Sequence, residues 1–329
     1  MVFHRLLGPR LHRRRFMAMG TSITITLNVR QYGAADAAIS EVQLQLVLFG
    51  RDAWAWGPGA LADFNRRLGA GERACIPASL LPLFRKAWSI HQATQGRFEP
   101  RVAALVRLWG FDDAARTRTT PPDADEITRL LAAMHRAPPY DGGGHYGPAP
   151  DVAWDLGALG KGYIVDLVLD HLVQRGFSQA SVDAGGHVGV RGLNGDRPWR
   201  IGIRDPRAAD DEVPPLVSLD ACDEAVVTHA DDQRYFEHGG RRYAHLLDAR
   251  TGWPVCGLQS LTVVHRDGGL ADAGGAALFV AGPAGWQALA QKLGISRVLA
   301  VLADGRVQVT QELAEVMRPR PGLSVQRLA

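Results

Sequence analysis

Hydrophobic and polar positions follow a two-residue period in some segments of the chain and a helical period in others. Residues 21–27 (TSITITL) alternate polar and apolar side chains, which predicts a strand. Apolar residues recur at helical spacing over residues 34–49, and Gly50 closes that run. Two more helices are predicted over residues 80–94 and 123–134, each bounded by proline or glycine.

The second half of the chain begins with a loop rich in proline and glycine, residues 136–150, followed by a strand or turn at Trp154. A helix is predicted over residues 163–174. Short strand-like runs then occupy residues 179–184, 187–193, 199–205, 225–229, 241–248 and 258–266. A last helix, rich in alanine and glycine, is expected to begin near Asp272, and residues 295–310 to form a terminal hairpin.

Helices and strands are mixed along the chain without a regular strand–helix–strand alternation. This pattern favours the α+β class over a doubly wound parallel sheet. We therefore expect a single large domain of mixed sheets flanked by helices, covering residues 16–329. Residues 1–15, which hold five arginines and no acidic residue, are expected to form a basic, disordered tail.

The composition is that of a globular protein, with 46% hydrophobic and 22% charged residues. A net charge of +3 is too small to indicate a nucleic-acid partner. No run of eighteen apolar residues occurs, so no transmembrane segment is expected, and the basic start has no signal-peptide h-region. Cys75, Cys222 and Cys256 form neither a zinc pattern nor a disulfide framework, which favours a reducing, cytoplasmic setting.

Two glycine-rich segments are candidates for ligand binding. Residues 155–166 (DLGALGKGYIVD) place Lys161 between glycines, which suits either a phosphate-binding loop or a structural turn. The segment matches neither the Walker A pattern nor the dinucleotide fingerprint. Residues 181–192 (SVDAGGHVGVRG) have Gly185-Gly186 between two apolar runs, which indicates either a bulge in a sheet or a ligand packed on bare backbone.

Two further segments carry side chains suited to catalysis. His245 precedes Asp248 in YAHLLDARTGWPV, and an acid can hold the tautomer of a histidine that acts as a general base. Asp272 stands in LADAGGAALFVAG where a helix is expected to begin. It is therefore interpreted either as a helix N-cap or as a carboxylate ligand for Mg²⁺.

Eight segments, taken in order, resemble the motifs of the FAD:protein FMN transferase (ApbE) family. They are MAMGTSITI, WAWGPGALADFNRRL, TQGRFEPRVAALVRLWGF, DLGALGKGYIVD, VDAGGHVGVRG, WRIGIRDPR, RRYAHLLDARTGWPV and LTVVHRDGGLADAGGAALFVAG. The resemblance runs from about Phe16 to the end of the chain and implies a T-fold-like domain. It also implies a magnesium-dependent reaction that splits FAD, joins FMN to a Thr or Ser hydroxyl of an acceptor flavoprotein, and releases AMP.

The resemblance also implies roles for individual residues. The positions that match FAD-contacting residues of the family are Met19, Trp56 (or Trp54), Arg97, Phe98, Glu99, Asp155, Lys161 and Leu247. Magnesium would be held by Asp272, by a backbone carbonyl near Ala158 and at the position of Ala276, where the family has threonine. His245 is the candidate for accepting the hydroxyl proton, and Asp272 is the alternative.

The chain departs from the family's motifs at positions expected to face the ligand. Ala276 lacks the threonine oxygen, a loss expected to weaken magnesium affinity by about 10–100-fold. His187 replaces an acid and His229 a serine, so these two histidines, expected in separate loops, raise the option of a softer metal. Ala249 replaces a proline, and Glu99 replaces a shorter acid.

Three functions follow from this combination of retained and altered motifs. The first is an active, magnesium-dependent flavin transferase that uses FAD as its substrate. The second is an FAD pyrophosphatase, in which the altered metal shell admits water as the nucleophile. The third is an FAD-binding protein without catalytic activity.

Overall fold

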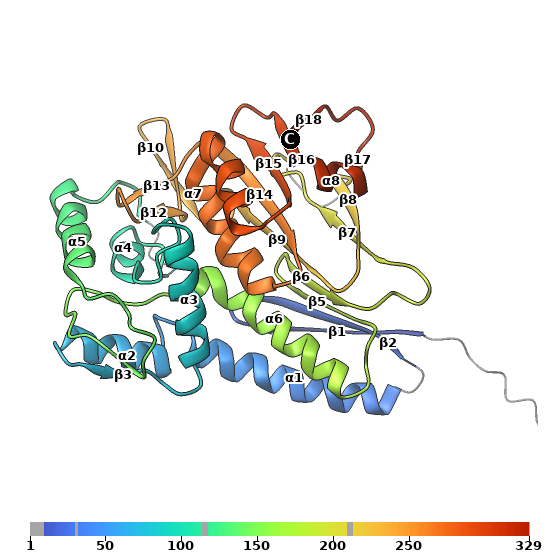
Figure 1. Cartoon of the computed structure of the whole chain (residues 1–329), viewed down its shortest axis with the longest axis horizontal. Helices are drawn as coiled ribbons and strands as arrows, with labels where there is room; N and C mark the ends of the chain where they lie inside the picture. Colours follow the sequence, from blue (N-terminus) through green and yellow to red (C-terminus); the bar gives the residue numbers. More distant parts are fainter. Residues whose placement is uncertain (1–9, 30–31, 114–117, 209–212, 329) are drawn as a thin grey trace, which may run out of the picture.

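The computed structural model describes residues 10–29, 32–113, 118–208 and 213–328, and its central element is a nine-stranded sheet (Figure 1). In sheet order the strands are β1 (Arg10–Ala18), β2 (Thr21–Val29), β5 (Ala180–Ala184), β6 (His187–Arg191), β9 (Ala225–Ala230), β14 (Leu258–His265), β15 (Arg297–Leu302), β16 (Val307–Thr310) and β18 (Val325–Leu328). Neighbouring strands are antiparallel except β16 and β18, which are parallel.

One face of this sheet is covered by three helices, α1 (Tyr32–Asp52), α6 (Gly157–Gln174) and α7 (Gly268–Leu293) (Figure 1). Under α1 and α6, β2 contributes the fully buried side chains Ile23, Ile25 and Leu27. Alternate residues of a strand point to the same face, so the period of two seen in the sequence marks the side that faces the core.

The opposite face of the central strands is covered by a three-stranded sheet and one short helix. These elements are β7 (Trp199–Ile203), β8 (Val217–Ala221), β17 (Met317–Pro319) and α8 (Gln311–Val316). Val263 of β14 packs in the cluster that includes α7, whereas the next residue, Val264, packs in the cluster beneath the small sheet. Burial on both faces explains why six of the eight residues of β14 are buried.

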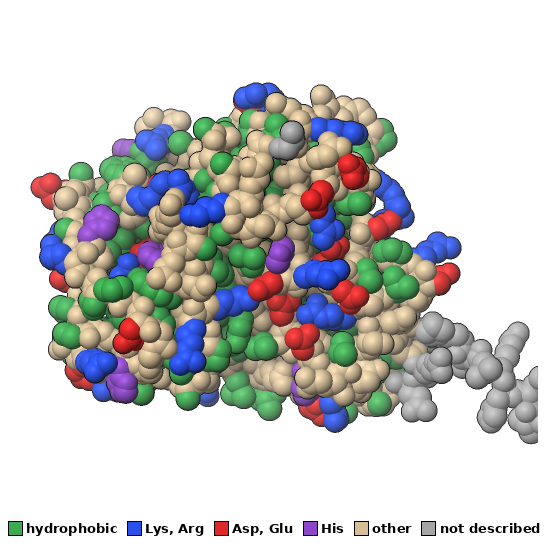
Figure 2. Space-filling view, in the orientation of Figure 1, with side chains coloured by type: hydrophobic (Ala, Val, Ile, Leu, Met, Phe, Trp, Pro, Cys, Tyr) green, Lys and Arg blue, Asp and Glu red, His purple; other side chains and the backbone are tan. Residues whose placement is uncertain are grey.

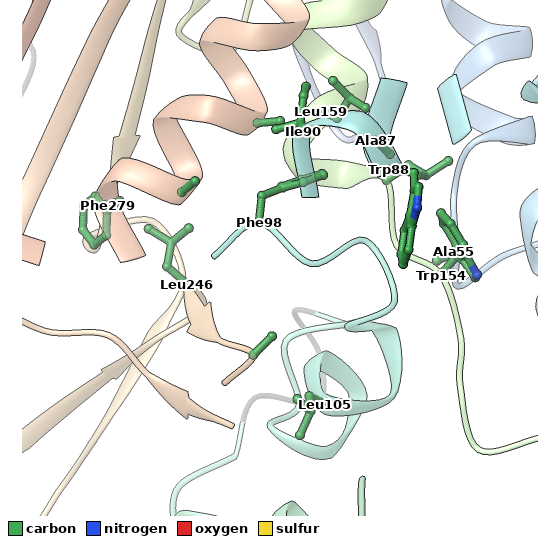
Figure 3. Close-up of a cluster of buried hydrophobic side chains, with 14 of the residues drawn as sticks. Ala55, Ala87, Trp88, Ile90, Phe98, Leu105, Trp154, Leu159, Leu246 and Phe279 are labelled. Atoms are coloured by element: carbon green, nitrogen blue, oxygen red, sulfur yellow. The ribbon is translucent and has the colours of Figure 1, made fainter. Parts of the chain in front are cut away.

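The remaining elements pack beside α7 (left in Figure 1) and share its core cluster. They are α2 (Ala60–Gly69), α3 (Leu81–Ala93), α4 (Ala103–Leu108), α5 (Ala124–Arg136) and the strand pairs β3 (Ala74–Cys75) with β4 (His145–Tyr146), β10 (Tyr235–His238) with β11 (Arg241–Ala244), and β12 (Leu247–Asp248) with β13 (Trp253–Pro254). In Figure 3, Trp88 of α3 stands beside Ala55 and Trp154 in this cluster.

The predicted α+β class is confirmed, and most predicted strands occur within one or two residues of their expected ends. The strand predicted over residues 241–248 is wrong, because that segment is divided between β11 and β12, which have different partners. Helices α2, α4 and α8 were not predicted, since each has ten residues or fewer and shows little periodicity.

Two predicted helix starts are wrong. Helix α6 begins at Gly157 rather than near residue 163, and α7 begins at Gly268 rather than at Asp272. The N-cap of α7 is Asp267, whose side chain accepts a hydrogen bond from the Leu270 N–H at 2.8 Å. In both cases glycines lie inside the first turn of the helix, Gly157 and Gly160 in α6 and Gly268 and Gly269 in α7.

The predicted disordered tail is wrong for residues 10–15, which form part of β1 and pair with β2 over its full length. Residues 1–9 lie outside the described part of the chain. Within the described residues, no helix combines the length and the apolar character that a membrane span requires. On the face shown in Figure 2, acidic and basic side chains are interspersed, in keeping with the small net charge.

Helices α6 and α7 cross closely because a glycine occupies the contact. A Cβ atom on Gly162 would lie 2.0 Å from the carbonyl oxygen of Gly268 and 2.8 Å from Cβ of Asp272. Both distances are shorter than van der Waals contact, so any larger residue must push the helices apart. The glycine that follows Lys161 is therefore required by packing between the helices.

We expect the substitution Gly162→Ala to lower the free energy of unfolding by about 1–3 kcal/mol or more, because the added methyl group overpacks the crossing. Gly160→Ala in the same helix is the matched control. Its Cβ would lie 3.6 Å from the ring of Phe49, an ordinary contact. Since alanine favours helix over glycine by about 1 kcal/mol, this control is expected to be neutral or stabilising. Equal urea midpoints for the two variants would contradict the close crossing.

Candidate active site

The segment from Asp155 to Asp166 forms the beginning of α6. Asp155 precedes the helix, and its Oδ1 accepts a hydrogen bond from the Gly157 N–H at 2.8 Å. The Asp155 N–H donates to the carbonyl of Pro100 at 2.7 Å. Unpaired N–H groups and the positive end of the helix dipole meet at such a terminus. The motif is thus neither a turn nor a free loop, but a helix N-terminus of the kind that suits an anion.

Asp272 lies in the second turn of α7 and is completely buried. Its Oδ2 accepts a hydrogen bond from the Gly162 N–H at 2.9 Å, and its Oδ1 accepts one from Nε2 of His187 at 3.1 Å. The interpretation of Asp272 as a helix N-cap is therefore wrong. Its carboxylate instead links α7 to α6 and to β6.

His187 and His229 lie on neighbouring strands of the large sheet, so their expected location in separate loops is wrong. β6 pairs with β9, and His187 stands opposite Val227. His229 is two residues beyond Val227 and points to the same face, toward α7. Its Nε2 is 2.8 Å from the carbonyl oxygen of Asp272 and 3.7 Å from Oδ1 of the same residue.

The hydrogen-bond acceptors of His187 and His229 determine which ring nitrogen carries the hydrogen. A carbonyl oxygen only accepts hydrogen bonds, so Nε2 of His229 carries a hydrogen. Nε2 of His187 likewise donates to the carboxylate, and its Nδ1 is buried without a partner among the described residues. Burial lowers the pKa of His187 and lowers that of His229 to about 4, against the effect of Asp272. Both imidazoles are therefore neutral N–H donors near neutral pH.

The carboxylate of Asp272 stays ionised in this setting. Burial by itself would raise the pKa of Asp272, but the hydrogen bond from His187 and the charge of Lys161 outweigh burial and lower it below its usual range.

Lys161 is the charged centre of the site. Its ammonium group affects the pKa of five surrounding side chains, Asp155, His187, His229, His245 and Asp272. Within the described residues it has no hydrogen bond or ion pair of its own. Burial raises the pKa of Asp155, and Lys161 partly offsets that rise. The ammonium group is therefore available to a ligand.

His245 is oriented by backbone and not by the acid predicted from sequence. Its Nδ1 is 3.3 Å from the carbonyl oxygen of Arg234, so Nδ1 carries the hydrogen and Nε2 keeps its lone pair. Asp248 instead binds the guanidinium of Arg250, at 2.8 Å from Oδ1 and 2.7 Å from Oδ2. Burial, followed by the charge of Arg234, lowers the pKa of His245 to about 4.

Comparison with known proteins identifies the group to which this arrangement belongs. The model of the ApbE family matches residues 19–299. The chain belongs to the ApbE family. It is 33% identical over 304 residues to a protein of Rhodobacter capsulatus named FAD:protein FMN transferase, covering 91% of this chain and 57% of that relative. A Vibrio cholerae protein of the same name is 29% identical over 297 residues, covering 87% of this chain and 86% of the relative.

Solved structures of the ApbE family have the same fold. The ApbE protein of Thermotoga maritima superposes with a TM-score of 0.81 at 27% identity, covering 94% of this chain and all of that one. The flavin transferase ApbE of Vibrio cholerae gives a TM-score of 0.80 at 25% identity, again covering 94% of this chain and all of that one.

Three of the expected FAD contacts lie outside α6, in a turn, a loop and a short strand. Met19 adopts a positive φ of 54° in the turn between β1 and β2, and its Cγ packs against the bare backbone of Gly50. Trp56 is half-buried, with the guanidinium of Arg107 5.2 Å from its ring centroid. Leu247 is half-buried in β12, two residues after His245.

The segment Arg97–Glu99 behaves mainly as part of the core. Phe98 is 4% exposed and lies among Ile90, Leu159 and Leu246 in Figure 3. Glu99 forms a two-point ion pair with Arg101, at 2.8 Å for each oxygen. Arg97 has a buried Nε without a partner among the described residues, so it is the member of this segment with capacity left for a ligand.

The two remaining positions belong to the expected magnesium site. Ala158 is the second residue of α6 and is half-buried. Ala276 is 6% exposed and follows Asp272 by four residues, which places both on the same side of α7. The sequence did not reveal Gly162 or Arg234 as parts of the site. The only available signal for Gly162 was its place in the glycine-rich segment before the predicted helix, and there was none for Arg234.

The neutral imidazole of His229 predicts a pH-dependent stability. Its pKa is about 4 in the folded chain, against about 6.5 for an exposed histidine, so the unfolded chain binds more protons between these values. The free energy of unfolding should therefore fall as the pH falls from 6.5 toward 4, by up to about 1.4 kcal/mol per pH unit for this proton. In urea titrations, His229→Gln should reduce the slope, whereas His135→Gln at an exposed position should not. A slope unchanged in His229→Gln would contradict the assignment.

Proposed function

We propose that the chain is a flavin transferase that moves FMN from FAD onto a Thr or Ser hydroxyl of an acceptor flavoprotein and releases AMP. The observation that carries this proposal is the grouping of Lys161, His245 and Asp272 near the N-terminus of α6 in a chain of the ApbE family. Relatives that align with most of the chain are named for this activity.

The proposed reaction needs a group that removes the hydroxyl proton. The hydroxyl oxygen attacks the phosphorus of the FMN half, the bond from that phosphorus to the AMP oxygen breaks, and AMP departs. His245 is suited to accept the proton because its Nε2 has a free lone pair and its imidazole is neutral. Asp272 is less suited, since both carboxylate oxygens already accept hydrogen bonds and its pKa is lowered.

The proposed substrate is recognised through its negative charge. The pyrophosphate of FAD would lie at the N-terminus of α6, where backbone N–H groups and the helix dipole favour an anion. Lys161 extends from the second turn of the same helix, so its ammonium can bind the same phosphates. Together these groups stabilise the charge that builds up on the leaving phosphate.

The family resemblance also implies Mg²⁺, and the residues at the expected positions determine whether the site could hold it. Mg²⁺ prefers six oxygen ligands in octahedral geometry. At the expected positions Ala276 offers a methyl group, Ala158 offers one backbone carbonyl, and Asp272 offers a carboxylate already bonded to two N–H groups. These residues do not supply the oxygen ligands that Mg²⁺ prefers, and the proposed reaction does not use the ion.

The proposal includes a reducing, cytoplasmic setting. Cys75, Cys222 and Cys256 are exposed and unpaired, which supports it. The acceptor is identified by its chemistry, as a flavoprotein with an accessible Thr or Ser hydroxyl.

Incubation of the purified chain with FAD and a Thr-containing acceptor should add the mass of one FMN to the acceptor, with release of an equal amount of AMP. Mass spectrometry of the acceptor is the measurement. His245→Gln should slow the transfer by about 10²–10⁴-fold while leaving FAD bound, because general base catalysis contributes on that scale. Release of AMP and free FMN without flavin on the acceptor would instead identify an FAD pyrophosphatase. Bound FAD without AMP release would identify a binding protein.

Lys161→Ala should weaken FAD binding by about 10–100-fold, which corresponds to one charge-assisted hydrogen bond. The fold should be retained, because the ammonium forms no hydrogen bond or ion pair among the described residues. Lys292→Ala, in the exposed last turn of α7, is the matched control. Flavin fluorescence titration measures both variants, and equal affinities would remove Lys161 from the FAD site.

A further inference from the structure

Each oxygen of the Asp272 carboxylate accepts one hydrogen bond from the protein. Gly162 donates its N–H to Oδ2 at 2.9 Å, and His187 donates from Nε2 to Oδ1 at 3.1 Å. The Asp272 side chain is 1% exposed and that of His187 is 8% exposed. A cation that bound to Oδ1 would have to approach past the His187 N–H, which carries the same sign of partial charge.

A second imidazole fills the space beside this carboxylate. Nε2 of His229 donates to the backbone carbonyl of Asp272 at 2.8 Å and lies 3.7 Å from Oδ1. The ring packs against the bare backbone of Gly275, where an added Cβ would lie 2.9 Å from Cδ2 of His229. His229 and Gly275 therefore fit together as a pair, and the ring occupies the turn of α7 that leads from Asp272 to Ala276.

The charge of Asp272 is also balanced within the protein. Lys161 is near enough to lower the pKa of Asp272, while His187 and His229 are neutral donors. A divalent cation at Asp272 would therefore also meet the like charge of Lys161 nearby. Within the described residues, no three side chains of His, Cys, Asp or Glu are grouped so as to hold a metal ion, which argues against a transition metal as well.

We infer that in this chain the N–H groups of Gly162 and His187, which donate to the carboxylate, and the ring of His229 beside it take the place of a divalent cation at Asp272. The chain therefore binds flavin nucleotide with an affinity that does not depend on Mg²⁺ at this carboxylate. This part of the inference rests on the proposed function. The other part, that the Asp272 carboxylate does not bind Mg²⁺ in the free protein, is independent of the proposed function.

The first test is a Mg²⁺ titration of the purified, ligand-free chain by isothermal calorimetry, alongside its melting temperature with Mg²⁺ and with EDTA. We expect no saturable heat at millimolar Mg²⁺ and equal melting temperatures. Saturable binding that is lost in Asp272→Asn would overturn the inference. Because no FAD is present, this result stands even if the proposed function fails.

The second test restores oxygen ligands at the positions where this chain lacks them. His187→Asp combined with Ala276→Thr removes one N–H donor and adds three side-chain oxygens, two from the carboxylate and one from the hydroxyl. We expect this variant to bind Mg²⁺ and to melt at a higher temperature with Mg²⁺ than with EDTA. His135→Asp, at an exposed position, is the control and should not respond. If the double variant does not fold, Ala276→Thr alone is measured in the same way.

The third test concerns FAD, whose binding is followed by flavin fluorescence with Mg²⁺ and with EDTA. We expect dissociation constants that agree within about twofold for the unmodified chain, a difference of roughly 0.4 kcal/mol. Tenfold tighter binding with Mg²⁺, lost in Asp272→Asn, would overturn the inference. No FAD binding in either buffer would instead refute the proposed function and leave the first test to decide the metal question.

Discussion

The buried carboxylate of Asp272 is the constraint on which the arrangement of the site depends. An ionised carboxylate inside a protein must be fully hydrogen-bonded or matched by opposite charge, because its desolvation is costly. Here its two oxygens accept from the Gly162 N–H in α6 and from His187 in β6, while His229 in β9 donates to the backbone carbonyl of the same residue. Satisfying this one group therefore holds two helices and the central sheet in a single relative position.

The same constraint explains where Lys161 lies. Gly162 must be at the α6–α7 crossing, since a side chain there would collide with Gly268. The preceding residue is thereby fixed on α6, near Asp155 at the start of the helix and near His245 from another loop. A packing requirement in the core thus determines the position of the charge that is available to a ligand.

Much of the fold could be read from the sequence, because alternation in strands such as residues 21–27 and the helical period over residues 34–49 reflect burial directly. The starts of α6 and α7 could not, since glycines that favour turns locally are placed in helices by tertiary contact. The hydrogen-bond partners of the candidate catalytic residues could not be predicted either. The pairing of His245 with the Arg234 carbonyl and of His187 with Asp272 depends on strand register and on long-range packing, which sequence spacing does not record.

The contact between His229 and Gly275 has a consequence for how such a site can change during evolution. With any side chain at position 275, the imidazole at position 229 would be displaced from the carbonyl of Asp272. The glycine must therefore be present before the histidine can arise, whereas the reverse order passes through an intermediate with a steric clash. Replacement of the histidine by a small residue would in turn leave an opening beside α7. Substitutions at positions 229 and 275 are thus expected to occur in a fixed order. Each residue limits which side chains the other position can accept.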